Sequence, residues 1–195
     1  MQVAPHFKPV FVYKQAMTNT LMRAERSLLL LIDFQARLLP QIDGAAACEA
    51  NARRLLAAAD LLAVPVLVTE QNPEGLGHTA AGLGVAGRTS VAKHTFGSCA
   101  APAFMKAIGT HSDIVVTGRE AHVCVLQTVL GLLDLGRKVF LVRDAVGARR
   151  TESKETALAR MARHGADIVT TEMVVFEWLR TSEHPNFRAV LQLIK

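Results

Sequence analysis

The length, composition and charge of the chain exclude several classes of protein. Its 195 residues suit a single domain, and a content of 50% hydrophobic and 20% charged residues excludes disordered and fibrous chains. The net charge of +5 is concentrated at the start, because the first 26 residues hold four Lys or Arg and one Glu, which leaves +2 for residues 27–195. We therefore expect no nucleic-acid partner, since such binding needs a stripe of Lys and Arg.

The cysteines and the apolar runs indicate the cellular setting. Cys48, Cys99 and Cys124 form no CxxC pair, so neither a disulfide framework nor a zinc knuckle is indicated, and a reducing compartment follows. The apolar run at residues 28–32 is broken by Asp33 and is far too short to span a bilayer. We therefore expect a cytoplasmic protein with no membrane partner.

The first half of the chain predicts an extension followed by a βαβ unit. Residues 1–26 lack clear periodicity, and we interpret them as an N-terminal extension: a bacterial leader or an overextended start rather than a transit peptide. Residues 27–34 form the continuous apolar run that central parallel strands show. Strong helix formers at residues 45–63 and a second strand at residues 64–69 complete the unit. Residues 71–88 contain a proline and five glycines and are expected to be mostly loop.

The second half continues the alternation of strands and helices. The expected elements are a strand at 89–93, a helix at 101–109, a strand at 114–118, a helix at 121–136, a strand at 139–142, a helix at 151–165, and a sixth strand followed by a helix within 167–180. Thr151 is the expected N-cap of its helix. This order predicts an α/β fold in one domain, residues 27–195: a doubly wound, Rossmann-like parallel sheet of six strands with helices on both faces.

Three residues with useful chemistry are expected at the carboxyl edge of this sheet. Asp33 ends the first strand, Lys93 ends the third, and Cys124 opens the helix after the fourth. There a carboxylate can take the proton of a thiol, and an ammonium group can stabilise negative charge. Taken singly, Asp33 could be a turn residue and Lys93 a solvated lysine, but their joint placement favours a site.

Cys124 is the candidate nucleophile. A position in the first turn of a helix favours a thiolate over a thiol, because the helix N-terminus carries partial positive charge. We therefore expect iodoacetamide to label Cys124 before Cys48 and Cys99. The alternative is that Cys124 is a small core residue, since unpaired cysteine is among the most buried residue types.

Four segments resemble one known family. They are IDFQARLLPQI, VTEQNPEGLG, VAKHTFGSCAAPAF and TGREAHVCVLQTVLGLLDLGRKVFLVRDAVGAR. They are similar to segments of the isochorismatase-like cysteine hydrolases, in particular their YcaC-like and isochorismatase-domain branches, over residues 27–195. The resemblance implies the isochorismatase-like hydrolase fold and a catalytic triad of Asp33, Lys93 and Cys124.

The resemblance also implies an oxyanion hole. In the family a non-proline cis peptide bond lies upstream of the cysteine, and here it falls between Arg119 and Glu120. Its implied use is to turn the backbone N–H of Glu120 toward that of Cys124, so that the two groups can bind an oxyanion.

No metal or other cofactor is expected. Family nicotinamidases carry a metal-binding aspartate and histidine two residues apart after the second strand, and the matching positions here hold Glu70 and Asn72. Asn72 is a poor replacement for an imidazole, and no histidine lies at a zinc-site spacing. The segment GLGVAG at residues 82–87 matches GxGxxG but has a loop before it and a strand after it, so dinucleotide binding is not expected.

These observations predict a metal-independent cysteine hydrolase that acts on a small amide-like substrate through a thioester, at a C–N bond other than a peptide bond. One alternative is an isochorismate-type vinyl-ether hydrolase, which would use Asp33 and Lys93 only. Another is a non-catalytic binding or scaffold protein of the same fold. The candidate residues of the substrate pocket are Phe34, Phe96 and His122, because they lie close in the sequence to Asp33, Lys93 and Cys124.

A homo-oligomer is also expected, as a dimer, tetramer or octamer, because YcaC-like relatives assemble in these ways. Phe176, Trp178 and Leu179 are candidate interface residues. Packing inside one subunit explains Trp178 equally well.

Overall fold

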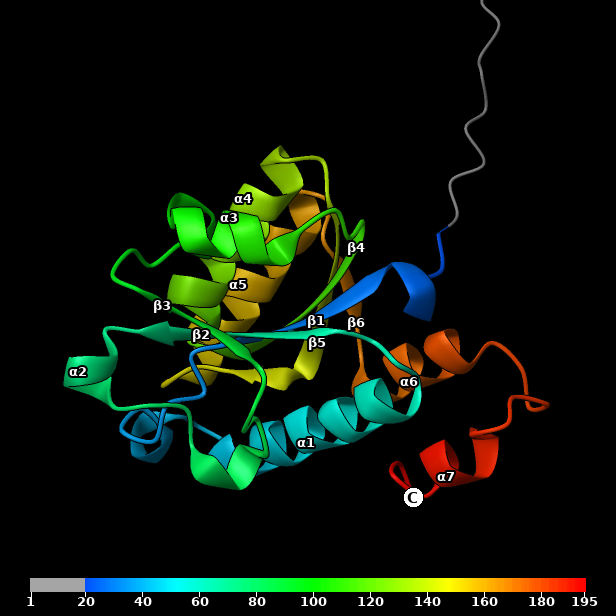
Figure 1. The fold of residues 1–195 in the computed structure, drawn as a ribbon. Helices are drawn as coiled ribbons and strands as arrows, with labels where there is room; N and C mark the ends of the chain where they lie inside the picture. Colours follow the sequence, from blue (N-terminus) through cyan, green and yellow to red (C-terminus); the bar gives the residue numbers. More distant parts are fainter. Residues whose placement is uncertain (1–19) are drawn as a thin grey trace, which may run out of the picture.

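Six parallel strands form the centre of the molecule. The computed structural model describes residues 20–195, in which the strands lie in the order β3-β2-β1-β4-β5-β6 (Figure 1). Their bounds are β1 (Ser27–Ile32), β2 (Val66–Gln71), β3 (Thr89–Lys93), β4 (Asp113–Arg119), β5 (Lys138–Gly147) and β6 (Asp167–Val169). Neighbouring strands all pair in parallel, so the predicted doubly wound α/β sheet of six strands is confirmed.

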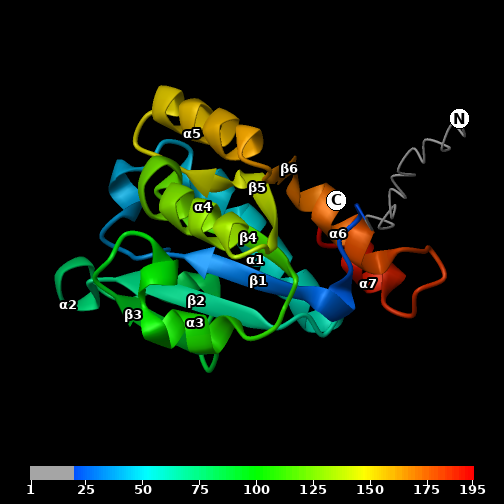
Figure 2. The same ribbon diagram turned by 90° about the horizontal axis from the view of Figure 1, so that it is seen from above.

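Helices cover both faces of the sheet, as predicted (Figures 1 and 2). One face carries α1 (Ala45–Leu61), α6 (Thr171–Leu179) and α7 (Phe187–Leu191), and the other carries α3 (Pro102–Ile108), α4 (Leu126–Asp134) and α5 (Thr151–Arg163). A short helix, α2 (Pro73–Leu76), interrupts the segment expected to be loop, and a π-helical turn, η5 (Ala121–Val125), precedes α4.

The strand β1 shows why the central strands are apolar throughout. Leu29 and Leu31 pack in the hydrophobic cluster that includes α1 and α6. Leu28, Leu30 and Ile32 pack in the cluster that includes α4 and α5. Every residue of β1 is buried, because side chains on both faces of the strand meet a layer of helices.

The direction of winding reverses between β1 and β4, which is where open α/β sheets bind ligands at their carboxyl edge. Gly118 allows these two strands to approach each other. Its φ is 153°, and a Cβ atom at this position would lie 2.5 Å from the carbonyl oxygen of Ile32. The close approach brings the residues that follow β1 and β4, including Asp33 and Cys124, to the same edge of the sheet.

Part of the expected extension packs on the domain. Met22 is fully buried, and its N–H donates to Glu177 Oε2 at 2.8 Å. Arg26 forms an ion pair with Asp113 at 3.0 Å. Residues 1–19, which hold most of the expected leader, lie outside the described residues, and the boundary after residue 26 stays a prediction.

The helix α6 buries some of its large side chains and exposes others. Trp178 is 3% exposed and its Nε1 donates to Ser27 Oγ at 3.0 Å, and Leu179 is also buried. The core alternative therefore holds for Trp178, and the interface prediction was wrong for Leu179, because this face of α6 packs on α1 and β5. Phe176 points away from the core and is 41% exposed.

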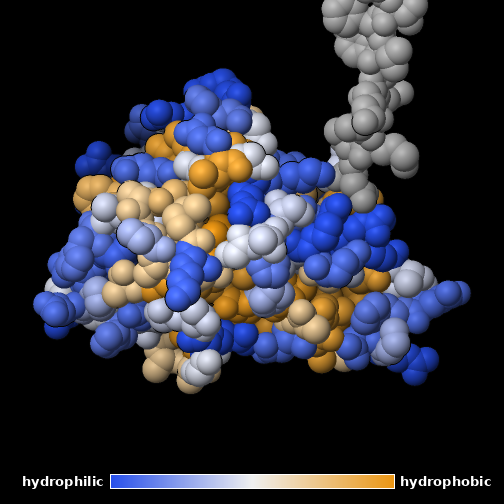
Figure 3. Space-filling model, turned by 45° about the horizontal axis from the view of Figure 1, so that its top comes forward, coloured by the Kyte–Doolittle hydropathy of each residue, from blue (hydrophilic) through white to orange (hydrophobic). Residues whose placement is uncertain are grey.

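The surface differs from the apolar interior. The face drawn in Figure 3 mixes both kinds of side chain, with hydrophilic ones mainly around its rim and orange, hydrophobic ones across its centre and lower part. Within residues 20–195, none of the helices combines the length and the apolar character needed to cross a bilayer.

Replacing Gly118 with alanine should lower the free energy of unfolding by about 2 kcal/mol or more, because the added methyl group would collide with β1 at a φ that side chains rarely adopt. Urea unfolding followed by circular dichroism measures the change. Gly82→Ala is the matched control, since the nearest atoms to its added methyl group lie 3.9 Å away. Equal effects of the two substitutions would contradict the proposed role of Gly118.

Candidate active site

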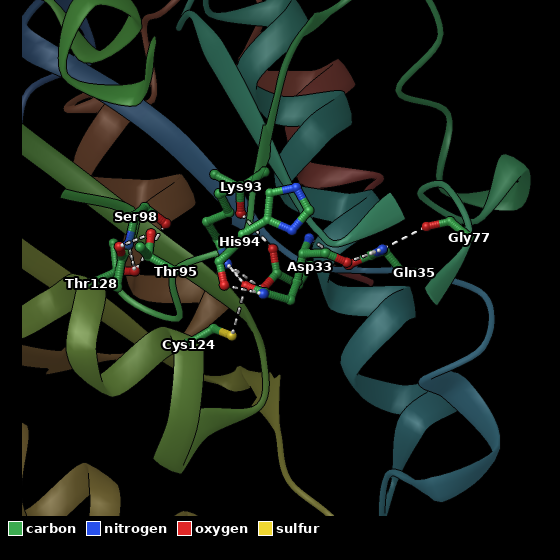
Figure 4. A network of polar contacts seen from close by, with 12 residues as sticks. Asp33, Gln35, Gly77, Lys93, His94, Thr95, Ser98, Cys124 and Thr128 are labelled. Carbon is green, nitrogen blue, oxygen red and sulfur yellow. Dashed lines mark hydrogen bonds and ion pairs between the residues drawn. The ribbon is translucent and has the colours of Figure 1, made fainter. Parts of the chain in front are cut away.

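A buried ion pair lies at the carboxyl edge of the sheet (Figure 4). Asp33 directly follows β1, and Lys93 is the last residue of β3, with β2 between the two strands. Nζ of Lys93 lies 2.8 Å from Oδ2 of Asp33, and both side chains are fully buried. The other carboxylate oxygen accepts a hydrogen bond from Thr69 Oγ1 at 2.7 Å. Both oxygens of Asp33 are therefore held in defined positions.

Gln71 is the member of this cluster that the sequence did not reveal. Its Oε1 accepts a hydrogen bond from Lys93 Nζ at 2.8 Å, and its Nε2 donates to the carbonyl of His94 at 2.7 Å. Its backbone is held by Gln35, which accepts from the Gln71 N–H at 2.8 Å and donates to the Gln71 carbonyl at 2.9 Å. The expected second strand ended at Thr69, whereas β2 continues to Gln71 and pairs this residue with Lys93. A second strand predicted two residues longer would have placed Gln71 at the carboxyl edge of the sheet, beside Lys93.

Cys124 faces the cluster from the other side of the switch point, with Sγ 4.0 Å from Oε1 of Gln71 (Figure 4). It lies in the π-helical turn η5, not in the first turn of an α-helix as predicted. The carbonyl of Glu120 accepts from the N–H groups of Val123 at 3.0 Å and Val125 at 3.3 Å, and within residues 20–195 it receives none from Cys124. The peptide bond between Arg119 and Glu120 is cis, as the resemblance implied.

The surroundings of Cys124 disfavour a thiolate in the free protein. Burial and the charge of Asp33 together raise its pKa to about 12, although the ammonium group of Lys93 acts in the opposite direction. Burial likewise raises the pKa of Cys99 to about 11, and raises that of Cys48. Desolvation and the neighbouring carboxylate therefore argue against the resting thiolate expected from the sequence, and alkylation decides between the two.

The three candidate pocket residues lie in different surroundings. Phe34 is 1% exposed and packs in the cluster on the α1 face, with the guanidinium of Arg119 stacked 4.7 Å from its ring centre. Phe96 is 53% exposed on the loop after β3. His122 lies in η5 and lines a hollow of about 370 Å³. The solvent-accessible candidates are therefore Phe96 and His122.

The loop that carries Phe96 is anchored to α4. The N–H of Ser98 donates to Thr128 Oγ1 at 3.0 Å, and the Thr128 hydroxyl donates to Ser98 Oγ at 3.0 Å. Figure 4 shows this pair beside the cluster of Lys93 and Asp33. The anchor fixes the end of the loop close to the catalytic candidates.

A family model described as "Isochorismatase domain" matches residues 27–173. The chain belongs to the isochorismatase family. This is a family of hydrolases, and isochorismatase domain-containing protein 2A of Mus musculus is 37% identical to the chain over 174 residues, which cover 88% of this chain and 84% of the mouse protein.

Solved isochorismatase-like structures show the same fold. A Caenorhabditis elegans structure described as MAR1 ribonuclease is 34% identical with a TM-score of 0.85, over 89% of this chain and 91% of that chain. The YcaC gene product of Escherichia coli, described as an octameric hydrolase of unknown specificity, is 24% identical with a TM-score of 0.83, over 89% of both chains. The isochorismatase-like hydrolase fold is thereby confirmed.

Glu70, which matches a metal-binding position of the nicotinamidases, holds the loop after β2 instead. Both carboxylate oxygens of Glu70 are occupied: Oε1 accepts from the N–H and the hydroxyl of Thr79, each at 2.7 Å, and Oε2 lies 3.0 Å from His78 Nδ1. Among residues 20–195 no group of three potential metal ligands occurs. Glu70 and Asn72 therefore do not fit a metal ion, and metal independence stays a prediction that metal analysis of the purified protein would check.

Alkylation should reveal the resting state of the thiols. At pH 7.5 iodoacetamide should modify Cys99, which is only half-buried, before Cys124, because only the thiolate reacts and the pKa of Cys124 is the higher. Labelling of Cys124 should accelerate about tenfold per pH unit as more thiolate forms. Peptide mapping by mass spectrometry gives the rates at each cysteine.

Substitution of Asp33 supplies a second check on the same reaction. Asp33→Asn removes a charge that raises the pKa of Cys124 and should therefore speed its labelling, whereas Asp60→Asn, which alters a surface ion pair with Arg88, should leave it unchanged. Fast labelling of Cys124 in the unsubstituted protein at neutral pH would show that its thiolate is stabilised after all.

Proposed function

We propose that the protein is a metal-independent cysteine hydrolase of a small amide-like substrate, at a C–N bond other than a peptide bond. The observation that carries the proposal is the buried pair of Asp33 and Lys93, 2.8 Å apart, with the sulfur of Cys124 facing it across Gln71. A carboxylate, an ammonium group and a thiol at the switch point of an α/β sheet are the groups that acyl transfer to sulfur requires.

In the first half-reaction Cys124 attacks the substrate carbonyl. At pH 7 only roughly one molecule in 10⁵ holds a free thiolate, given the raised pKa, so the proton passes to Asp33 as the C–S bond forms. Each carboxylate oxygen keeps a lone pair for this proton beside its bond to Thr69 or Lys93. Asp33 then gives the proton to the leaving nitrogen as the C–N bond breaks, which leaves a thioester on Cys124.

In the second half-reaction water replaces the amine. Asp33 takes a proton from a water molecule, whose oxygen attacks the thioester carbonyl, and the C–S bond breaks as the proton returns to sulfur. Lys93 keeps Asp33 in position in both halves, at 2.8 Å. The carboxylic acid leaves and the original thiol and carboxylate are restored.

Backbone amides supply the expected oxyanion hole in this proposal. The N–H groups of Glu120 and Cys124 would bind the oxygen that becomes negative in each tetrahedral intermediate. One feature supports this role: the π-helical pattern in which the Glu120 carbonyl accepts from the N–H groups of Val123 and Val125.

Catalysis should depend on all three side chains. Cys124→Ala, Asp33→Asn and Lys93→Met should each lower amide hydrolysis by about 10³-fold or more, because each removes the nucleophile, the proton carrier or the group that positions it. The measurement is amine release from a panel of small amides. Cys99→Ala, which changes a thiol outside the cluster, should retain the activity.

The same panel distinguishes the other candidate functions. Turnover of a vinyl ether that survives Cys124→Ala but not Asp33→Asn would support the isochorismate-type reaction. Binding of panel members without turnover would support the non-catalytic alternative. An RNA oligonucleotide belongs in the panel because the Caenorhabditis elegans relative is described as a ribonuclease, and its cleavage would replace the amide proposal.

We also propose that the chain forms a homo-oligomer through α6. Escherichia coli YcaC is described as octameric. Leu21, Met173 and Phe176 are 46%, 45% and 41% exposed and line one hollow of about 560 Å³. Large apolar side chains gathered on a surface are typical of an interface.

Light scattering should therefore give a mass that is a multiple of the single chain at micromolar concentration. Phe176→Glu should reduce it, because a charge would be buried in the contact. Leu135→Glu, at another exposed leucine, is the control and should not change the mass. A single-chain mass for the unsubstituted protein would reject assembly.

We also propose that the protein is located in the cytoplasm. Cys48, Cys99 and Cys124 are all free thiols, which suits a reducing compartment. Fractionation of the source cells would check it.

A further inference from the structure

A fully buried arginine lies beside the proposed catalytic residues. Arg119 is the last residue of β4, and its side chain has no exposed surface, which is rare for an arginine. Its Nη2 donates to the carbonyl of Ala45, the first residue of α1, at 3.1 Å. Its Nε and Nη1 are buried and have no hydrogen-bond partner within residues 20–195. A buried charge with two unpaired nitrogens lowers stability, so its presence needs an explanation.

Pairing with an anion does not explain the burial of Arg119. Among the described residues, Glu49 is the one carboxylate within 4.0 Å of its guanidinium, and Glu49 Oε2 lies at that limit. The other oxygen of Glu49 is bound by Arg53 at 2.5 Å. The neighbouring thiol of Cys48 is no counter-ion either, because burial raises its pKa despite the opposing charge of Arg119. Another contact must therefore account for the position of this guanidinium.

That contact is with Phe34. The guanidinium carbon lies 4.7 Å from the centre of the Phe34 ring, within the range of a cation–π interaction, and the ring is 1% exposed. Phe34 directly follows Asp33, the proposed proton carrier. The register that pairs Ile32 with Gly118 places Asp33 and Arg119 at the same level of two neighbouring strands. Arg119 thus packs on the residue next to Asp33 in the chain.

Asp33 needs such support because its backbone is strained. Its φ is 53°, a left-handed value that is uncommon for residues other than glycine. The N–H of Asp33 donates to the carbonyl of Thr69 at 3.1 Å, and the carbonyl of Phe34 accepts from the N–H of Ala80 at 2.9 Å. Such a backbone persists only where its surroundings over-determine it, and this kind of strain is concentrated at active sites. On the α1 face of the sheet, the support is the buried ring of Phe34.

We propose that Arg119 is a positioning residue of the Cys124 reaction: by packing on Phe34 it holds the carboxylate of Asp33 in place to exchange a proton with Cys124. The inference rests on the proposed hydrolase function. Arg119 acts through Phe34 and Asp33 rather than on the sulfur. Its two unpaired nitrogens are then a loss of stability retained for function, as is typical where a functional site breaks the rules of packing.

The rate of Cys124 alkylation tests the proposal without any need for turnover. The charge of Asp33 opposes formation of the Cys124 thiolate, so a displaced carboxylate should let Cys124 react faster. At pH 9, Arg119→Met should therefore raise the rate of alkylation by iodoacetamide about threefold or more. Loss of a nearby positive charge would act in the opposite direction, because it would raise the pKa of the thiol. The sign of the change therefore separates a displaced Asp33 from a direct effect of charge.

Arg137→Met is the matched control for this measurement. Arg137 also donates to backbone carbonyls, those of His111 at 2.6 Å and Gly109 at 2.7 Å, but at the amino edge of the sheet. Its replacement should leave the rate at Cys124 unchanged, and an equal acceleration in both variants would overturn the proposal. Peptide mapping by mass spectrometry gives the rates.

A double substitution shows whether Arg119 acts through Asp33. In Asp33→Asn the opposing charge is already absent, so the addition of Arg119→Met should cause no further acceleration. Independent effects that multiply in the double variant would overturn the proposal, as would an Arg119→Met rate that is unchanged or lower. An Asp33→Asn variant that reacts no faster than the unsubstituted protein would overturn it too, because Asp33 could not then transmit the effect of Arg119 to Cys124.

Urea unfolding separates positioning from a purely structural role. Arg119→Met should not lower the urea midpoint, because replacing a buried charge with an apolar side chain is often neutral or stabilising. Phe34→Leu is the second variant: it keeps the arginine, removes the ring and should accelerate alkylation of Cys124 in the same way, even if Arg119→Met does not fold. A lower midpoint in these variants with no change in the rate at Cys124 would show a structural role and overturn the proposal.

Turnover supplies the last measurement. On an amide that the protein hydrolyses, Arg119→Met should lower kcat about tenfold or more and leave KM within about twofold, because proton transfer is misaligned while the groups that bind substrate remain. A raised KM with an unchanged kcat would overturn the proposal. If no amide is hydrolysed while the alkylation results hold, Arg119 still positions Asp33, and the proposed chemistry alone fails.

Discussion

The contact on which the site depends is the buried ion pair between Asp33 and Lys93. Two charges without access to water are tolerated only when each is paired and hydrogen-bonded, and removing one partner of such a pair typically costs about 3–5 kcal/mol. Here Thr69 satisfies the second oxygen of Asp33, and Gln71 satisfies a second proton of Lys93. The requirement for these partners ties the carboxyl ends of β1, β2 and β3 together, so the same bonds that allow the charges to be buried also fix the geometry of the proposed proton carrier.

Burial has the opposite consequence for Cys124, which it keeps as a thiol. The neighbouring carboxylate that could accept its proton also raises its pKa, so the sulfur becomes nucleophilic only when the proton has somewhere to go during attack. This separates the proposed enzyme from those that store a free thiolate. A thiol of this kind is also protected from unselective oxidation, since thiolate character and exposure determine susceptibility.

The turn η5 presents Cys124 to the Asp33 cluster. A π-helical turn places one additional residue between the end of β4 and the regular helix, and such turns are frequent at functional sites. Cys124 on this turn faces the Asp33 cluster, while His122, two residues earlier, lines a polar hollow beside α5. Arg149 attaches this turn to the loop after β5 through its ion pair with Glu120.

The sequence by itself determined the order of strands and helices, because continuous apolar runs and helical periodicity are local properties of the chain. The carboxyl ends of parallel strands meet at one edge of the sheet, and this rule was enough to predict that Asp33, Lys93 and Cys124 lie together. Tertiary structure decided what depends on neighbours distant in the chain. The role of Gln71 required the register between β2 and β3, and the resting state of Cys124 depends on burial and on a carboxylate 91 residues away, as the two residue numbers show. Thr151, the expected N-cap, is instead the first residue of α5, and its hydroxyl bonds to Asp43, a partner that no local pattern predicts.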